Sequence, residues 1–258
     1  MSLKKIVVIG SSNTDMVVKA NRLPVPGETV LGGNFMMNPG GKGANQAVTI
    51  SRLGGNVSFI TKTGNDLFGK QSVEMFAEEN INTDYVFSDA NNPSGVALIM
   101  VDENGENCIV VASGANGTLS PTDIDKARTL IESADILLMQ LETPLETLEY
   151  AAKFAHKKGV KVILNPAPAA FLSNSFLKCV NIIVPNKTEA ELLSGIKIED
   201  WTSAHNAAEI IGDKGIENVI ITLGSKGALI KEGAEFHEVP VEKIKAVDTT
   251  AAGDTFCG

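Results

Sequence analysis

Short apolar runs alternate along the chain with longer segments of amphipathic, helical period. The runs are rich in β-branched residues and lack strict polar alternation, which is typical of parallel strands covered on both faces. The predicted strands are Ile6–Ile9, Ser58–Thr61, Ile136–Gln140, Val160–Leu164, Ile182–Val184 and Val219–Thr222. The predicted helices cover residues 43–53, 67–80, 121–133, 144–158, 187–194 and 203–214, and Ser120-Pro121 and Thr143-Pro144 are typical of an N-cap followed by proline. This order predicts an α/β fold with a doubly wound, mostly parallel sheet flanked by helices.

Two stretches interrupt this alternation. Residues 16–39 contain β-type runs, prolines and glycines without a helical period, and residues 94–112 are typical of a hairpin that turns at 102–105. We expect both to form a small antiparallel sheet, a lid over one edge of an α/β domain. That domain would comprise residues 1–15, 40–93 and 113–258. The apolar hairpin strands favour pairing of such a lid with a second chain.

Charge and composition exclude several function classes. The 258 residues carry a net charge of −9, which argues against a nucleic acid or an anionic membrane as partner. The apolar runs are far shorter than the ~20 residues of a membrane span. No export signal follows Met1, and Cys108, Cys179 and Cys257 form no CxxC pair. We therefore expect a cytoplasmic protein with reduced thiols.

Candidate ligand-binding residues follow the predicted strands, because open α/β sheets bind ligands beyond the carboxyl ends of their strands. Asn13 and Asp15 follow the first strand, and in an extended segment both would face one side. A carboxylate beside an amide suits sugar hydroxyls, and an Asx turn is the alternative. The segment Asn38–Asn45 is rich in glycine and lets the backbone approach a ligand, or it is a flexible turn. Glu142 follows another strand directly.

Two further segments suit a nucleotide and a metal ion. Asn186 and Glu189 lie three residues apart at the start of a helix, where oxygen ligands suit a hydrated Mg²⁺. The alternative is an Asn cap with a first-turn glutamate. Residues 222–227 follow a strand with glycines and a serine, which suits nucleotide contacts, although a plain tight turn is equally compatible.

The most specific segment lies near the end of the chain, at residues 247–256. Small residues and Gly253 precede Asp254 at a predicted helix start, where free backbone amides and the helix dipole form an anion hole. A carboxylate beside such a hole suits a general base that takes a proton from an attacking hydroxyl. An ordinary N-cap aspartate is the alternative.

These motifs, in this order, resemble the ribokinase-like sugar kinases. The resemblance rests on Asn13-x-Asp15, Pro26-Gly-Glu-Thr29, Gly40-Gly-Lys-Gly-Ala-Asn45, Met139-Gln-Leu-Glu142, Asn165-Pro-Ala-Pro168, Asn186-Lys-Thr-Glu189, Thr222-Leu-Gly-Ser225 and Asp248-Thr-Thr-Ala-Ala-Gly-Asp254. It extends from about residue 4 to the end of the chain. Each motif alone is modest, but the ordered set is highly specific.

The resemblance implies a role for each matched position. The sugar would be bound by Asn13, Thr14, Asp15, Gly41, Lys42, Gly43, Ala44, Asn45, Glu142 and Asp254, with Ala97 and Ile99 of the lid over its apolar face. ATP would be bound by Asn186, Glu189, Thr222, Leu223, Gly224, Ser225, Lys226, Gly227 and Gly253. Asp254 would be the base, and the backbone amides of Ala251, Ala252, Gly253 and Asp254 would stabilise the transferred phosphoryl group.

The resemblance also implies the cofactors and the assembly. Glu189 would position Mg²⁺ through water, and Asp248 and Thr250 would bind an activating K⁺. Family members pair through their lids, so we expect a homodimer. Family members also continue past the position of Gly258 with part of the adenine pocket, more cation ligands and the rest of the last helix.

The expected reaction is the phosphorylation of D-ribose at its 5-hydroxyl by ATP, giving ribose 5-phosphate and ADP. A related kinase for deoxyribose, fructose or adenosine is the first alternative. A non-catalytic, dimeric ribose-binding protein is the second. Turnover across a panel of sugars separates a ribose kinase from a related kinase for another sugar or nucleoside. Ribose binding without ADP release would identify the non-catalytic binding protein.

Overall fold

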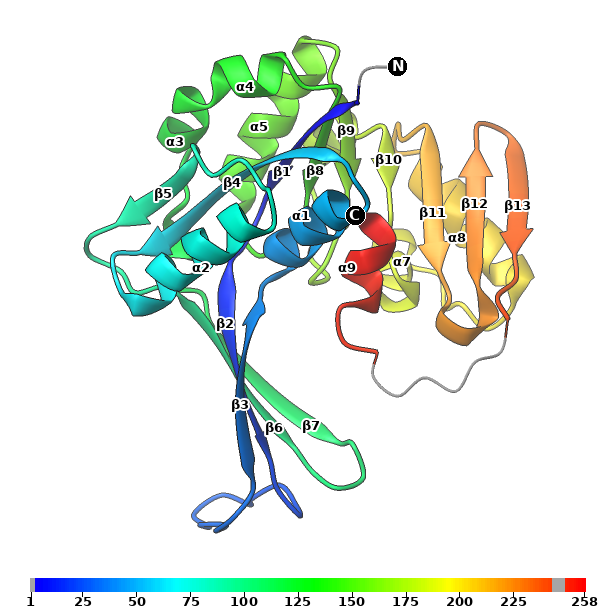
Figure 1. The fold of residues 1–258 in the computed structure, drawn as a ribbon. Helices are drawn as coiled ribbons and strands as arrows, with labels where there is room; N and C mark the ends of the chain where they lie inside the picture. The colour runs from blue at the N-terminus through cyan, green and yellow to red at the C-terminus, as the bar shows by residue number, and fades with distance from the viewer. Residues whose placement is uncertain (1–2, 243–248) are drawn as a thin grey trace.

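A nine-stranded sheet forms the centre of the molecule (Figure 1). The computed structural model describes residues 3–242 and 249–258. The strand order is β13 (Glu235–Val239), β12 (Ala228–Glu232), β11 (Asn218–Thr222), β10 (Ile182–Ile183), β9 (Lys161–Leu164), β8 (Ile136–Met139), β1 (Lys5–Ile9), β4 (Asn56–Gly64) and β5 (Val86–Asp89). Every pair from β11 to β5 is parallel, whereas β12 and β13 are antiparallel additions at one edge. The predicted doubly wound, mostly parallel sheet is confirmed.

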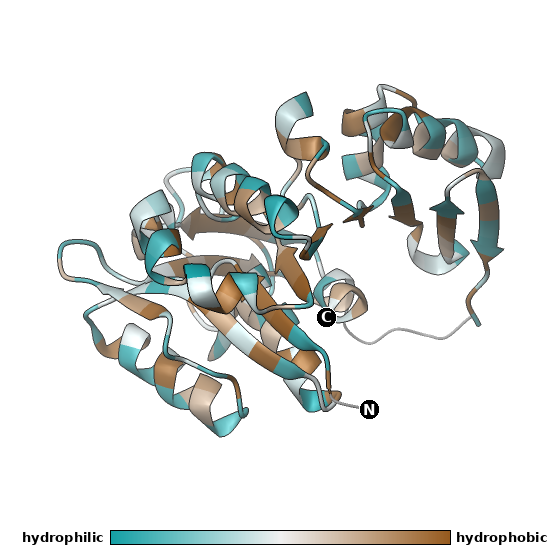
Figure 2. Cartoon of the chain, turned by 90° about the horizontal axis from the view of Figure 1, so that it is seen from above, coloured by the Kyte–Doolittle hydropathy of each residue, from teal (hydrophilic) through white to brown (hydrophobic). Residues whose placement is uncertain are grey.

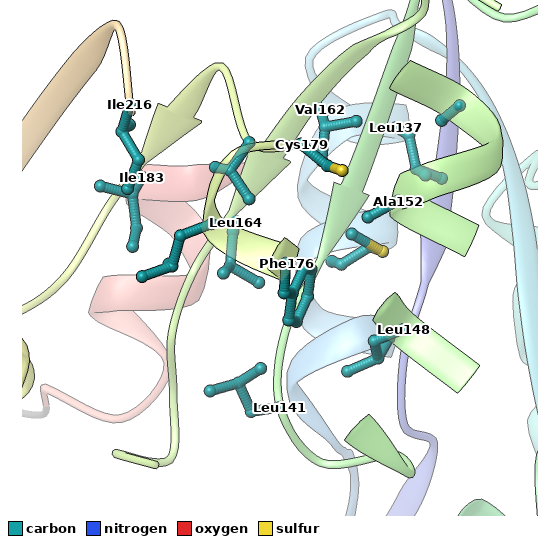
Figure 3. Close-up of a cluster of buried hydrophobic side chains, with 14 of the residues drawn as sticks. Leu137, Leu141, Leu148, Ala152, Val162, Leu164, Phe176, Cys179, Ile183 and Ile216 are labelled. Carbon is teal, nitrogen blue, oxygen red and sulfur yellow. The ribbon is translucent and has the colours of Figure 1, made fainter. Parts of the chain in front are cut away.

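Helices cover both faces of this sheet. They are α1 (Lys42–Arg52), α2 (Leu67–Glu78), α3 (Pro121–Lys126), α4 (Arg128–Glu132), α5 (Leu145–Lys157), α6 (Asn174–Leu177), α7 (Lys187–Ser194), α8 (Trp201–Gly212) and α9 (Ala252–Cys257), with short 3₁₀ turns at Gly114–Thr118 and Gly224–Lys226. One buried cluster packs α3 to α8 against the sheet, and a second packs α1 and α2 against the other face. Figure 3 shows the part of the first cluster around Leu148, Phe176 and Leu164. Figure 2 shows apolar strands between helices that carry many hydrophilic positions.

The side chains of β1 and β8 explain the missing polar alternation. Val7 and Leu137 belong to the first buried cluster, whereas their neighbours Val8 and Leu138 belong to the second. Both faces of each strand are therefore buried under helices. Within the described parts of the chain, no helix combines the length and apolarity that a membrane crossing needs.

Several predicted elements differ from those observed. The helix predicted over residues 121–133 is divided at Ala127, which is the C-cap of α3 and the N-cap of α4. Ser120 caps α3 as expected, but Pro144, not Thr143, is the N-cap of α5. The sequence pattern did not indicate β5, α6, or the hairpin of β12 and β13. The other predicted elements lie within a few residues of those observed, the scatter usual for element ends.

Four strands form the separate small sheet, in the order β3 (Asn34–Gly40), β2 (Asn13–Lys19), β6 (Gly95–Val101) and β7 (Asn107–Ala112). The predicted hairpin is confirmed as the antiparallel pair β6 and β7, and β2 and β3 are also antiparallel. The central pair β2 and β6 is parallel, so the expectation of a wholly antiparallel sheet is wrong. Both central strands leave the large sheet region in the same direction, as Figure 1 shows.

We expect Phe59→Ala to destabilise the fold strongly. Phe59 is fully buried in β4, and its ring meets Phe76 of α2 edge-to-face at 5.1 Å. Removing a buried aromatic ring costs about 3–5 kcal/mol, measurable as a lower free energy of unfolding in urea. Phe171 is 84% exposed, so Phe171→Ala is the matched control and should change stability by less than about 0.5 kcal/mol. Equal effects of the two substitutions would contradict this account of the core.

Candidate active site

A polar pocket of about 210 Å³ lies beyond the carboxyl ends of the central strands. Asn165 follows β9, Asn186 follows β10, and Thr222 ends β11, so three neighbouring strands supply part of its wall. Lys42 from the start of α1 and Asp254 from α9 add two charged groups to the lining. Its other lining residues are Ala167, Val184, Glu189, Thr249, Ala251, Ala252, Gly253 and Cys257. This is the edge at which open α/β sheets bind ligands.

Asn13, Thr14 and Asp15 begin strand β2, so the extended arrangement was predicted correctly and the Asx turn is excluded. Alternate residues of a strand share a face, which places Asn13 and Asp15 on the same side of the small sheet. Asp15 pairs in register with Ala97 of β6, and Ile99 lies two residues further along that strand. The structure thus brings the predicted lid residues beside the predicted carboxylate.

The glycine-rich segment is a packed junction and not a flexible turn. Gly41 is the N-cap of α1 with φ of 93°, in the region that favours glycine. A Cβ on Gly43 would lie 2.7 Å from backbone atoms of Gly10, and one on Gly40 would lie 2.2 Å from the Asp15 carboxylate. These glycines therefore let α1 start directly against the end of β1 and beside Asp15.

Glu142 joins this junction to the loop that follows strand β8. Its Oε2 accepts a hydrogen bond from the Ser11 hydroxyl and another, at 3.0 Å, from the backbone N–H of Lys42. The Ser11 carbonyl accepts in turn from the backbone N–H of Ala44 at 2.9 Å. The predicted residues Lys42, Ala44 and Glu142 are thus connected through Ser11.

Asp15 lies in an unfavourable electrostatic environment. The pKa of its carboxyl is raised from the ordinary 3.8 to about 6, first by burial and then by the nearby Glu142, while Lys42 opposes both. A carboxylate in such a place is stabilised when a ligand hydroxyl donates a hydrogen bond to it.

Asn186 and Glu189 form a reciprocal capping box at the start of α7. The Asn186 side chain accepts from the Glu189 N–H at 2.9 Å, and Glu189 accepts from the Asn186 N–H at 2.8 Å and from its Nδ2 at 2.8 Å. The alternative interpretation, an Asn cap with a first-turn glutamate, is therefore confirmed. Both residues also line the pocket. Burial raises the pKa of Glu189, as does Asp254, whereas the Asn186 N–H and Lys42 lower it.

The segment after β11 is a tight turn. The N–H of Leu223 donates to the carbonyl of Gly227 at 2.8 Å, and a Cβ on Gly227 would lie 2.0 Å from the Val239 carbonyl oxygen. Thr222 lines the pocket and forms an isolated parallel β-bridge with Asn186. The pocket lining does not include the other predicted nucleotide-binding residues of this turn, Leu223, Gly224, Ser225, Lys226 and Gly227. The Lys226 ammonium donates to the Glu199 carbonyl at 3.0 Å.

Asp254 lies in the first turn of α9 and is 6% exposed. The N-cap is Ala251, so Asp254 is not an N-cap aspartate. Its Oδ2 accepts from Asn45 at 2.9 Å, and its Oδ1 accepts from Gln46 at 3.2 Å. Asn45 belongs to the glycine-rich segment, so this contact joins the predicted sugar site to the predicted phosphoryl-transfer site.

The backbone before α9 is tightly turned. Ala251 has φ of 57°, a conformation that costs a residue with a Cβ of order 1 kcal/mol or more. The N–H of Ala252 donates to the Thr249 carbonyl at 3.2 Å, so this predicted anion-hole amide already has a partner. Gly253 lines the pocket, and a Cβ at that position would meet open space. Asp248, one of the two predicted K⁺ ligands, lies outside the described residues, and the role of Thr250 stays a prediction.

Residues 3–258 match the pfkB family carbohydrate kinases. The chain belongs to this family. It is 47% identical to a ribokinase of Haemophilus influenzae over 99% of this chain and 83% of that protein. It is 41% identical to a deoxyribokinase of Salmonella typhi over 98% of this chain and 83% of that protein. A solved structure titled as Arabidopsis thaliana ribokinase with ribose and ATP superposes with a TM-score of 0.91 at 33% identity, covering 99% of this chain and 84% of that one.

Four residues of this sugar kinase had no predicted role although they shape the site. Ser11 bonds Glu142, and Asn116 donates from Nδ2 to the Asn13 side chain at 2.8 Å. Gln46 bonds Asp254, and Cys257 lines the pocket with a pKa raised to about 12, first by burial and then by Asp254. Ser11 and Gln46 adjoin predicted motifs, whereas neither Asn116 nor Cys257 has a local pattern that indicates its position.

We expect Asp15→Asn to stabilise the kinase in a pH-dependent way. Between 3.8 and about 6 the folded protein holds a proton on Asp15 that the unfolded chain has lost, so wild-type stability falls as pH rises through this window. Asparagine does not titrate, so the stability of the variant does not fall in this window. The melting temperature of the variant minus that of the wild type should therefore increase from about pH 4 to about pH 6 and then stay constant. Thermal unfolding across this range measures it, with the exposed turn substitution Glu103→Gln as control. A constant difference at every pH would contradict the burial of this carboxyl.

Proposed function

We propose that the protein transfers the γ-phosphoryl group of ATP to the 5-hydroxyl of D-ribose. The observation that carries the proposal is the hydrogen bond from Asn45 to Asp254, which joins residues 209 positions apart. It places the candidate base between the sugar-binding segment and the polar pocket beyond the strands. A phosphoryl acceptor and a phosphoryl donor must meet at such a point.

The sugar is bound on the side of the small sheet. Asn13, Asp15 and Glu142 offer an amide and two carboxylates to ribose hydroxyls, and Lys42 balances part of their charge. Ala97, beside Asp15 in the register, and Ile99 cover the apolar face of the sugar. Thr14, Gly41, Gly43 and Ala44 shape the same site through their backbone.

Asp254 acts as the general base. Its carboxylate takes the proton of the 5-hydroxyl, the hydroxyl oxygen forms a bond to the γ-phosphorus, and the bond to the leaving ADP breaks. The backbone of Ala251 and Gly253 and the first turn of α9 stabilise the charge of the transferred group, whereas the N–H of Ala252 donates to the Thr249 carbonyl. Proton transfer supplies about 10²- to 10⁴-fold of the rate, so positioning and charge stabilisation supply the rest.

The nucleotide occupies the polar pocket along Asn186, Glu189, Thr222 and Gly253. Mg²⁺ arrives with ATP as part of the substrate. The described residues contain no cluster of three acidic, histidine or cysteine side chains, and both oxygens of Glu189 already bond Asn186. This donor set fits a hydrated Mg²⁺ that takes direct ligands from the phosphates and contacts Glu189 through water. K⁺ at Thr250 and Asp248 completes the proposal as an activator.

The relatives support ribose as the first substrate to test and deoxyribose as the second. The Haemophilus relative is named a ribokinase, the Arabidopsis structure is titled with ribose and ATP, and the Salmonella relative is named a deoxyribokinase. The two sugars differ only in the 2-hydroxyl, so a comparison of their kcat/KM values decides between them.

We expect Asp254→Asn to abolish turnover and keep ribose binding. Asparagine retains the size of the side chain but accepts no proton, so ribose-dependent ADP release should fall by at least about 10²-fold. Calorimetry should still detect ribose, and the exposed Asp213→Asn is the control with unchanged activity. Wild-type turnover in Asp254→Asn would contradict the role of the base, and no ADP release from the wild-type protein with any sugar would contradict the kinase proposal.

We propose further that a second copy of the chain covers the outer face of the small sheet. Register pairs place Met37, Met16, Leu98 and Val110 in one row across all four strands, on the face opposite Asp15. Leu98 is 54% exposed and Val110 is 66% exposed, and Phe35 and Met100 extend the same face. A contiguous apolar sheet face of this kind is typical of a protein interface.

We expect Leu98→Glu to convert the dimer to a monomer, because the substitution buries a charge at the centre of the proposed interface. Light scattering measures the mass of the wild-type and variant proteins. Phe171→Glu, at a more exposed apolar position outside the small sheet, should leave the mass unchanged. A monomeric wild-type protein, or a dimer that survives Leu98→Glu, would contradict this interface.

A further inference from the structure

A chain of buried amides ends on the Asp254 carboxylate. Gln140 donates from Nε2 to Gln46 Oε1 at 2.6 Å. Gln46 donates from its own Nε2 to Asn165 Oδ1 at 3.1 Å and to Asp254 Oδ1 at 3.2 Å. Asn165 donates from Nδ2 to the backbone carbonyl of Val184 at 2.9 Å. Gln46 and Gln140 are fully buried, so water does not replace these partners.

The donors and acceptors in this chain are fixed by the backbone. The Val184 carbonyl only accepts, so the Asn165 amide must turn its NH₂ group toward it and its oxygen toward Gln46. The Asn165 side-chain oxygen and the Asp254 carboxylate both accept hydrogen bonds, so the NH₂ group of Gln46 must point toward them. The oxygen of Gln46 then faces Gln140, which must donate. One backbone carbonyl therefore sets the orientation of three side-chain amides.

Gln140 is held in this orientation by close packing. Its Oε1 is buried without a hydrogen-bond partner, and a Cβ on Gly10 would lie only 2.0 Å from that atom. A buried amide oxygen without a partner is costly, so the Gln140 amide is retained at a cost to stability. A buried group left without a partner in a native protein calls for an explanation, and a role in the site is one.

We propose that Gln46, oriented by Gln140 and Asn165, is a positioning residue for Asp254. The proposal rests on the proposed function of Asp254 as the base. Gln46 anchors Oδ1 from inside the protein, and Asn45 approaches Oδ2 from the sugar side. Held at both oxygens, the carboxylate cannot rotate away from the incoming hydroxyl. Gln46 lies outside the pocket wall, so its removal should change kcat and leave ribose affinity intact.

Gln46→Met tests this directly, because methionine has a similar volume and no donor. The expected result is a kcat lower by up to about 100-fold with an unchanged dissociation constant for ribose. Gln140 bonds Gln46 and not Asp254, so Gln140→Met should lower kcat by a smaller factor. This second variant tests the proposal if Gln46→Met does not fold. Unchanged kcat in a folded Gln46→Met, or unchanged kcat in Gln140→Met, would overturn the proposal.

The double variant separates positioning from general loss of stability. If Gln140 acts only through Gln46, Gln140→Met should have no further effect on kcat in the Gln46→Met protein. Full additivity of the two effects would overturn the proposed chain. Thr147→Val is the control, since Thr147 is buried and its hydroxyl bonds the Leu119 carbonyl at 2.8 Å in the core. It should lower the melting temperature without changing kcat. Absent ADP release in the wild-type protein would instead reject the proposed function.

Discussion

The site depends on the contact between α1 and the Asp254 carboxylate. Asn45 and Gln46 are consecutive residues of α1, and each donates to a different oxygen of Asp254. Successive residues of a helix point about 100° apart, so a carboxylate bound by both is held against one side of α1. The backbone contact is equally close, since a Cβ on Gly258 would lie 2.5 Å from the Gln46 carbonyl oxygen. Gly258, the C-cap of α9, thus lets this end of the chain lie directly against the helix that carries the proposed sugar-binding segment.

The position of α1 is itself set by glycine. Gly10 directly follows β1 and Gly43 is the second residue of α1, and a Cβ on either would come within 2.8 Å of the backbone of the other. The helix therefore begins in direct backbone contact with the strand, a distance that no side chain allows. The amides near its start are thereby brought to Glu142 and, through Ser11, to the segment that continues into β2. Sheet, helix and small sheet meet at this one junction.

The sequence predicted the large sheet well because each central strand is buried on both faces and carries a continuous apolar run. It did not indicate β12 and β13, since these edge strands mix charged and apolar residues, as Glu235, His237 and Glu238 show. The sequence predicted that Asn13 and Asp15 share one face, because residues two apart in a strand point to the same side whatever the strand pairs with. The parallel pairing of β2 with β6, by contrast, depends on where distant strands leave the large sheet. Asn116 and Gln140 act through partners about 100 residues away, and local spacing does not indicate such contacts.

The charges around the pocket show how ligand binding and stability oppose each other. Asp15 and Glu142 repel one another, Asp254 repels Glu189, and Lys42 attracts both Asp15 and Glu189. Burial raises the pKa of Asp15 and of Glu189, so the protein holds both charged carboxylates less favourably than water would. In the proposed function, sugar hydroxyls at Asp15 and a hydrated cation near Glu189 would each stabilise the charged form of the carboxylate. Under this proposal, the arrangement that lowers the stability of the free protein increases the free energy gained when both substrates bind.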